Sequence, residues 1–198
     1  HLLANSIKIP SPSLETKPKR PPVIGTMAVF RRKKKIEHLL KACKVLKQRG
    51  HVFQVLIAGR GQRYLWLKSL IHAWGLTDVV SLHSWVEDKP DFFRKIDIYC
   101  VTSRTESFNI SLLEAMAHHT CVVSSACGGP SDIIIHEKSG YLFPVGNITT
   151  LVQQLEHLIT SPTERENLAK EGFKRASSHF SQTVLKHELA KILDGTRL

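Results

Sequence analysis

The chain has 198 residues, of which 42% are hydrophobic and 23% are charged, proportions that are ordinary for a globular protein. Its apolar runs are short and interrupted, far below the ~20 residues that span a bilayer, and the N-terminus has no secretory pattern. These features exclude the disordered and membrane-spanning classes, and we expect a cytoplasmic location. The most unusual bulk property is the formal net charge of +11 at pH 7.

A cationic domain of this size suits diphosphate ligands, an anionic lipid surface or nucleic acid. We disfavour nucleic acid because the basic residues are scattered, apart from clusters at 17–20 and 31–35. No recognition helix, aromatic RNA platform or zinc-finger pattern accompanies them. The four cysteines form no C-x-x-C pair, and three lie in apolar runs, so we expect neither a disulfide nor zinc.

Residues 1–22 contain five prolines and little periodicity, which indicates an extended linker. Because the chain begins with His1, we interpret it as a fragment of a longer protein. From residue 23 onward, apolar strand-like runs alternate with helical patterns, and this alternation predicts an α/β fold with a doubly wound parallel sheet. The expected strands are 23–30, 53–58, 79–82, 97–101, 121–124 and 140–144. The expected helices include 36–49, 62–74, 90–94, 148–159, 162–176 and 181–193.

The most informative stretch follows the fourth expected strand. Residues 102–109 are polar, and the apolar spacing after them predicts a buried helix ending near residue 117. Glu106 and Glu114 would lie roughly 12 Å apart along such a helix and about 80° apart around it. Between them, the helix N-terminus at residues 109–111 offers unpaired N–H groups to a phosphate. A carboxylate, an anion site and a second carboxylate match the polarity of a nucleotide sugar.

The segment Glu106-Ser107-Phe108, followed by Leu113-Glu114-Ala115-Met116-Ala117, resembles the signature of the retaining glycosyltransferases of family 4 (glycosyl transferases group 1), in which seven residues separate two glutamates. The resemblance covers residues 23–193. It implies one Rossmann-like half of a GT-B fold with a six-stranded sheet, namely the C-terminal, donor-binding domain. The N-terminal, acceptor-binding domain would precede the linker.

The resemblance also implies roles for individual residues. Glu106 and Lys34 would be catalytic, with Glu106 bound to donor sugar hydroxyls and Lys34 to the diphosphate. Glu114 would bind the ribose hydroxyls. No Asp-x-Asp is present, so we expect no metal and no cofactor, only a UDP-, GDP- or ADP-sugar as substrate. The remaining expected donor-binding residues are Ser107, Phe108, Asn109, Ile110, Gly59, Gly61, Arg32, Trp85 and Val86.

The basic loop departs from the family pattern. The family has an arginine there and, five residues later, a lysine followed by glycine. Lys34 occupies the lysine position, but Val29 occupies the arginine position and Lys35 the glycine position. Arg31 or Arg32 would replace the missing arginine only if the loop follows a different course.

The sequence departs from the family pattern at two more positions, residues 109 and 132. Asn109 stands where the family commonly has glycine. Asparagine tolerates left-handed backbone angles, so we expect the turn to survive. The turn at Cys127-Gly128-Gly129 resembles a family turn that shapes the floor of the pocket, with Asp132 in place of a glutamate. Pro130 is well placed to start a helix there.

The sequence therefore predicts a hexosyltransferase domain that acts on a glycan or lipid-linked acceptor, inactive without its N-terminal domain, in polysaccharide or lipopolysaccharide biosynthesis. It would be cytoplasmic, with an anionic membrane surface at the inner face as an additional partner. Two alternatives stay open. One is a nucleotide-sugar-binding domain without turnover, and the other is a basic module that binds nucleic acid or other anions.

Overall fold

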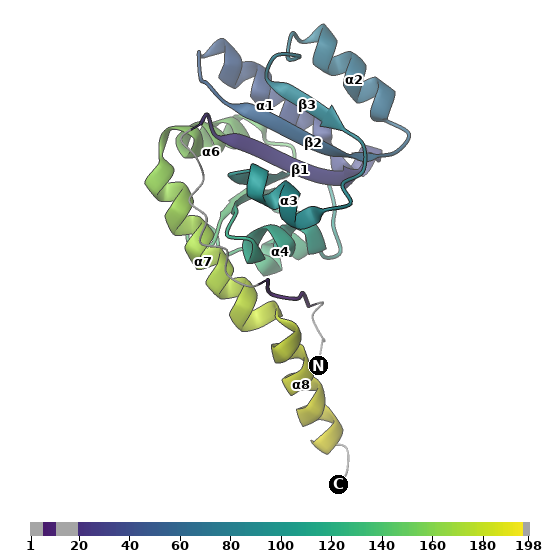
Figure 1. Ribbon diagram of the computed structural model, residues 1–198, viewed down its shortest axis with the longest axis vertical. Helices are drawn as coiled ribbons and strands as arrows, with labels where there is room; N and C mark the ends of the chain where they lie inside the picture. Colours follow the sequence, from purple (N-terminus) through teal and green to yellow (C-terminus); the bar gives the residue numbers. More distant parts are fainter. Residues whose placement is uncertain (1–5, 11–19, 196–198) are drawn as a thin grey trace.

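The computed structural model describes residues 6–10 and 20–195, and it shows one parallel sheet between two layers of helices (Figure 1). The strand order is β3-β2-β1-β4-β5-β6, and each pairing is parallel. This confirms the predicted Rossmann-like, doubly wound six-stranded sheet. The strands are β1 Val23–Val29, β2 Gln54–Arg60, β3 Val80–His83, β4 Ile98–Val101, β5 Cys121–Ser125 and β6 Tyr141–Phe143.

The helices fall close to their predicted positions, with two differences. The basic loop contains a short 3-10 turn, η1 (Arg32–Lys34), and the seventh helix continues four residues beyond its expected end. The helices are α1 Ile36–Gln48, α2 Tyr64–Ala73, α3 Lys89–Lys95, α4 Ile110–Ala117, α5 Gly129–Ile133, α6 Ile148–Thr160, α7 Pro162–Phe180 and α8 Gln182–Gly195.

The strand order reverses between β1 and β4. The chain passes from β1 outward to β2 and β3, then returns to pair β4 against β1 at Ile24↔Ile98 before continuing to β5 and β6. The loops that follow β1 and β4 therefore separate at the C-terminal edge of the sheet. Open α/β sheets bind ligands at this switch point.

Two apolar layers cover the sheet. On one face α1, α2 and α6 bury residues such as Leu39, Leu67 and Leu155 against the sheet. On the other face α3, α4 and α7 bury residues such as Phe93 and Leu113. Both faces of the sheet are thus closed to solvent, which is the condition for an all-parallel sheet. The open sides are the edges of the sheet and the ends of its strands.

The segment at residues 6–10 packs against the junction of α7 and α8. Ile7 is buried, its N–H donates to the Phe180 carbonyl at 2.9 Å, and its carbonyl accepts from the Gln182 N–H at 3.1 Å. Figure 1 shows α8 continuing beyond the sheet as an arm below α7. The linker predicted for residues 1–22 stays a prediction, because residues 1–5 and 11–19 lie outside the described part of the chain.

Within residues 6–10 and 20–195, we find no helix long and apolar enough to cross a bilayer.

All four cysteines are buried free thiols, and burial raises the pKa of Cys43 and Cys121 to about 12. These thiols are therefore protonated at neutral pH.

Candidate functional site

The basic turn after β1 is tied to the loop after β4. The Thr102 hydroxyl lies 3.0 Å from the Lys34 carbonyl and 2.9 Å from the Lys35 carbonyl. The Arg104 N–H donates to the Lys33 carbonyl at 2.7 Å. The two loops of the switch point are thus joined by one backbone hydrogen bond and by the Thr102 hydroxyl. Lys34 is held directly over the loop that carries the first glutamate.

Lys34 and Glu106 form an ion pair at the centre of this edge. The Lys34 Nζ lies 2.5 Å from Glu106 Oε1, and the Ser103 hydroxyl donates to the same oxygen at 2.6 Å. Glu106 is only 8% exposed. The cavity that it lines has about 10 Å³ of free volume, room for about one water molecule. In this structure, Lys34 closes the space above the carboxylate.

A pair of glycines fixes the backbone of Glu106 from below. The Glu106 N–H donates to the Cys127 carbonyl, and its own carbonyl accepts from the Gly129 N–H, both at 3.0 Å. A Cβ at Gly128 would lie 2.7 Å from the Glu106 carbonyl oxygen, and one at Gly129 would lie 2.6 Å from the Phe108 Cα. Side chains at either position would push the loop outward. This turn therefore supports the loop of Glu106, as the family resemblance implies.

Asn109 is the N-cap of α4. Its φ of −114° and ψ of 92° are extended, so the expectation of a left-handed turn is wrong. Asparagine suits the position for another reason: its side-chain oxygen accepts from the Leu112 N–H at 3.0 Å. The N–H groups of Ile110 and Ser111 belong to the first helical turn and have no intrahelical acceptor. They supply the positive end of the helix next to Lys34 and Glu106.

The second carboxylate also meets a lysine. Glu114 Oε1 lies 2.7 Å from the Nζ of Lys89, the first residue of α3. Glu114 Oε2 is buried and has no hydrogen-bond partner within the described residues. This pair lines a groove of about 540 Å³ beside Phe93 and residues 6–10. Lys89 was not among the predicted site residues, because no spacing along the chain connects it with Glu114.

The start of α4 separates the two carboxylates. Asn109 lines the small cavity of Glu106, whereas the next residue, Ile110, lines the groove of Glu114. Tyr99 is buried near both: burial raises its pKa well above the usual range, and the negative charges of Glu114 and Glu106 raise it further. The carboxylates therefore flank the same part of the sheet edge, but each opens into its own hollow.

Gly59 and Gly61 have a structural explanation that the sequence did not show. A Cβ at Gly59 would lie 1.9 Å from the Ala28 carbonyl oxygen, and one at Gly61 would lie 2.9 Å from the Phe30 nitrogen. Their φ angles of +154° and +143° also favour glycine. The atoms that approach these glycines belong to the backbone of β1 and to Phe30. Close packing within the protein therefore explains both glycines without a ligand. Their part in donor binding stays a prediction.

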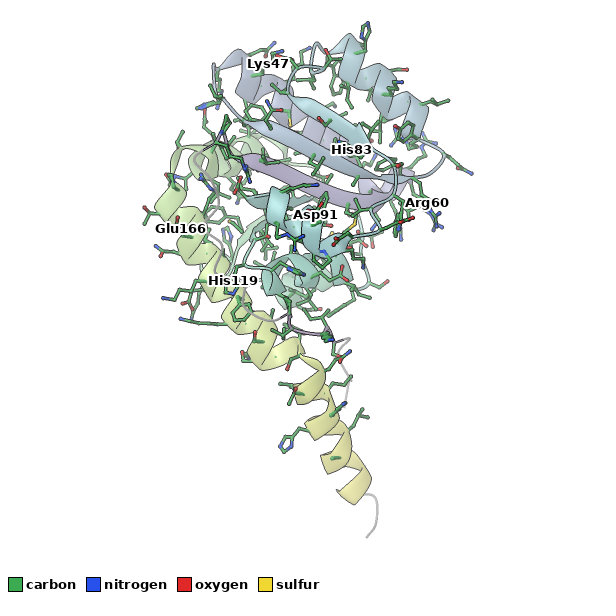
Figure 2. All side chains as sticks on the ribbon, in the orientation of Figure 1. Lys47, Arg60, His83, Asp91, His119 and Glu166 are labelled. Atoms are coloured by element: carbon green, nitrogen blue, oxygen red, sulfur yellow. The ribbon has the colours of Figure 1, made fainter. Side chains whose placement is uncertain are left out.

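The other predicted site residues lie around this edge of the sheet, some exposed and some packed against neighbours. The Arg60 guanidinium carbon lies 5.1 Å from the Trp85 ring centroid, and Figure 2 places Arg60 at the margin toward which the strands point. Val86 packs against the second apolar layer. Arg32 is exposed at the start of η1, and Phe108 packs 6.1 Å from Phe180. Ser107 is exposed beside Glu106.

Lys35 is the C-cap of η1 and the N-cap of α1, and its φ of +50° is left-handed, at the position where the resembling family has glycine. We expect Lys35→Val to lower the free energy of unfolding by about 1–2 kcal/mol, because a branched side chain is strained at this φ. Lys35→Gly should leave it within about 1 kcal/mol of the parent. Urea unfolding measures both. Equal losses would instead identify the contact of Lys35 with Glu37, 3.8 Å away, as the cause.

A parallel sheet with an ion pair and a helix N-terminus at its switch point defines a Rossmann-like α/β domain. The family model described as glycosyl transferases group 1 matches residues 11–175. The chain belongs to this family.

Curated relatives agree with this assignment. The chain is 30% identical over 179 residues to the amylovoran biosynthesis glycosyltransferase AmsK of Erwinia amylovora, covering 86% of this chain and 44% of AmsK. It is 24% identical to the lipopolysaccharide core biosynthesis glycosyltransferase LpsE of Rhizobium meliloti, covering 87% of this chain and 49% of LpsE. The chain thus spans about half the length of these relatives.

Solved structures show the same fold. HepE of Anabaena in complex with UDP matches with a TM-score of 0.81 at 22% identity, covering 87% of this chain and 48% of HepE. The C-terminal domain of LpcC, a glycosyl transferase group 1 family protein from Francisella tularensis, matches with a TM-score of 0.73 at 23% identity. That match covers 81% of this chain and 87% of the LpcC domain. The fold is therefore that of the C-terminal half of a GT-B glycosyltransferase.

Proposed function

We propose that this chain is the donor-binding half of a retaining hexosyltransferase, of family 4, that transfers a hexose from a nucleoside diphosphate sugar to a glycan or lipid-linked acceptor. The observation that carries this proposal is the contact between Lys34 and Glu106 beside the N-terminus of α4. This contact puts a cation, a carboxylate and free N–H groups at one point of the sheet edge. A sugar diphosphate needs partners of these three kinds.

Each group has a role in the proposed reaction. As the glycosidic bond to the diphosphate breaks, negative charge develops on the leaving phosphate. Lys34 and the first-turn N–H groups of α4 stabilise that charge without a metal ion. Glu106 accepts hydrogen bonds from hydroxyls of the hexose. Glu114 accepts from the ribose after its carboxylate turns toward the ligand, a turn that would also give its buried, unpartnered Oε2 a hydrogen-bond donor.

Donor binding would have to rearrange the ion pair that closes the site. The cavity of about 10 Å³ cannot hold a sugar while Lys34 covers Glu106. A diphosphate offers Lys34 two negative charges in place of one, and hexose hydroxyls offer Glu106 replacement donors. The ligand can therefore separate the pair without leaving either charge unsatisfied. This exchange favours a ligand that carries both a phosphate and a sugar.

The comparisons support this class of substrate. HepE was solved in complex with UDP, and AmsK and LpsE carry names that refer to amylovoran and lipopolysaccharide core biosynthesis. By analogy we assign this chain to polysaccharide or lipopolysaccharide biosynthesis. The acceptor site would lie in an N-terminal domain outside this chain, so that turnover requires a longer protein.

Isothermal titration with UDP, GDP, ADP and UDP-glucose tests the proposal on the 198-residue chain. We expect one of the diphosphates to bind, and Glu114→Ala to weaken that binding by about 10- to 100-fold, because a charged acceptor of the ribose is lost. Glu166→Ala, on the exposed side of α7, is the control and should bind as the parent does. If no diphosphate binds while duplex DNA binds with a steep salt dependence, the chain is an anion-binding module instead.

A domain that binds the donor without turnover is the second candidate, and Val29 favours it. Val29 stands at the arginine position of the family, and its 38% exposure places an apolar side chain at the C-terminal end of β1. Joining this chain to its acceptor domain and measuring sugar release from the bound donor would separate the two. Val29→Arg should raise the rate if the missing cation limits turnover.

A further inference from the structure

The net positive charge of this protein comes from the first part of the chain. Residues 1–77 contain 16 Lys and Arg but only two Asp and Glu, whereas residues 78–198 contain 12 Lys and Arg and 15 Asp and Glu. The first part therefore carries a net charge of +14 and the second −3. Within the described range 20–77, Glu37 is the only acidic residue. Such an asymmetry indicates a basic surface that meets an anionic partner.

The fold places three of these cations on the exposed sides of α1 and α2. These two helices lie side by side over the same face of the sheet (Figure 1). Lys41 and Lys44 of α1 and Lys68 of α2 are exposed, and none has an ion-pair partner within residues 6–10 and 20–195. The surface made by the exposed residues of α1 and α2 is called the α1–α2 face below.

The same face exposes large apolar side chains. Leu65 is 74% exposed and Trp66 is 40% exposed, both in the first turn of α2. The guanidinium of Arg63 lies 3.5 Å from the centre of the Trp66 ring. Exposed Leu and Trp beside cationic side chains are typical of a helix that lies in a membrane interface.

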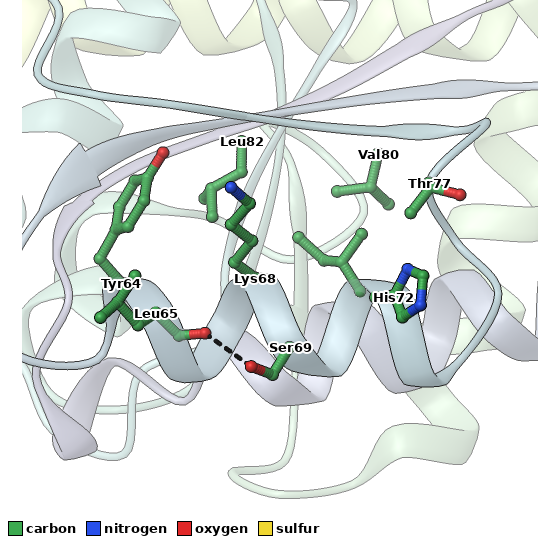
Figure 3. A pocket seen from close by; sticks show the side chains of 9 residues that line it. Tyr64, Leu65, Lys68, Ser69, His72, Thr77, Val80 and Leu82 are labelled. Atoms are coloured by element: carbon green, nitrogen blue, oxygen red, sulfur yellow. Dashed lines mark hydrogen bonds between the residues drawn. The ribbon is translucent and has the colours of Figure 1, made fainter.

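A groove runs along this part of α2. It has a volume of about 780 Å³ and lies between α2 and the edge strand β3 (Figure 3). On α2, Leu65, Lys68 and His72 line it from successive turns, and Val80 and Leu82 line it from β3. A mostly apolar lining that includes Lys68 suits an amphiphile with an anionic head group.

We propose that the α1–α2 face docks on an anionic lipid surface. Leu65 and Trp66 enter the boundary between head groups and acyl chains, while Lys41, Lys44 and Lys68 contact lipid phosphates. Nucleic acid fits this face less well. An exposed Leu gives no contact to a phosphate backbone, and Arg63 covers one face of Trp66, which a base would need for stacking. The inference stands independently of the proposed reaction.

A single fluorophore can report contact with lipid. The four native cysteines are at most 5% exposed, so Leu65→Cys creates the one accessible thiol among the described residues. We expect a polarity-sensitive dye on this thiol to shift to the blue with vesicles of phosphatidylcholine and phosphatidylglycerol, but not with phosphatidylcholine alone. The same dye on Lys170→Cys, exposed on α7, should not shift.

Two charge-matched variants test the location. Lys44→Glu with Lys68→Glu should weaken vesicle binding, measured by co-sedimentation, by about 25-fold or more, since each basic residue near an anionic surface contributes about fivefold. Lys170→Glu with Lys174→Glu makes the same change in net charge on α7 and should keep most of the binding. Thermal unfolding establishes that both variants fold.

Three outcomes would overturn the proposal. The first is the absence of binding to anionic vesicles at low salt. The second is an equal loss in both double variants without a blue shift at residue 65, which would mean unspecific attraction by the net charge. The third is strong binding to duplex DNA that competes with the vesicles, which would assign the basic face to nucleic acid.

Discussion

Replacing Gly59 with alanine should unfold or severely destabilise this protein. A Cβ at this position would lie 1.9 Å from the carbonyl oxygen of Ala28, and these two residues are register partners in β1 and β2. The obstacle is the backbone of a neighbouring strand, which cannot move without breaking the sheet. The φ of +154° adds strain for any residue with a side chain. We expect a loss of about 3–5 kcal/mol in the free energy of unfolding.

Gly75→Ala is the matched control. Gly75 also has a positive φ, +65°, but a Cβ there would meet nothing within 4 Å. The same substitution should therefore cost only about 1 kcal/mol, the penalty of a left-handed backbone. Urea unfolding of the two variants compares backbone strain alone with strain plus a steric clash. Equal losses would show that the end of β2 can relax away from β1.

The order of the strands and helices was predictable because local patterns determine it. The apolar spacing at Ile36, Leu39, Leu40, Cys43 and Leu46 predicts one buried face, and all five residues are buried in α1. Asparagine before an apolar helical run predicts an N-cap as readily as a left-handed turn. The loop that precedes α4 decides between the two, and it holds Asn109 in the extended conformation of an N-cap.

The contacts of the site could not be predicted in this way. Lys89 meets Glu114 only because α3 and α4 pack on the same face of the sheet, and no spacing along the chain encodes that contact. Gly59 is required by the neighbouring strand, which is also a tertiary contact. The family resemblance placed Lys34 and Glu106 in one site. It did not show that the two side chains touch and close that site.

Removing the charge of Lys34 should change both the free energy of unfolding and the affinity for ligand, and the two effects can be measured separately. Lys34→Met leaves the Glu106 carboxylate buried, with Ser103 as its remaining side-chain hydrogen-bond partner among the residues that the structure describes. We expect a loss of about 2–3 kcal/mol in the free energy of unfolding, the cost of an unpaired buried charge with partial access to solvent. Glu106→Gln should cost less, because Lys34 is more exposed and can turn toward water. The double variant should recover part of the loss seen in Lys34→Met.

We expect the three variants to rank differently in ligand affinity than in the free energy of unfolding, and this difference tests the assigned roles. If Lys34 holds the diphosphate, Lys34→Met and the double variant should both lose UDP affinity, by tenfold or more, whatever their stability. If Glu106 holds only the sugar, Glu106→Gln should bind UDP as the parent does but lose any additional affinity for UDP-glucose. Titration calorimetry of the three variants with both ligands measures this. Parallel losses for both ligands in Glu106→Gln would contradict the assignment of Glu106 to the hexose and show that its ion pair with Lys34 serves diphosphate binding.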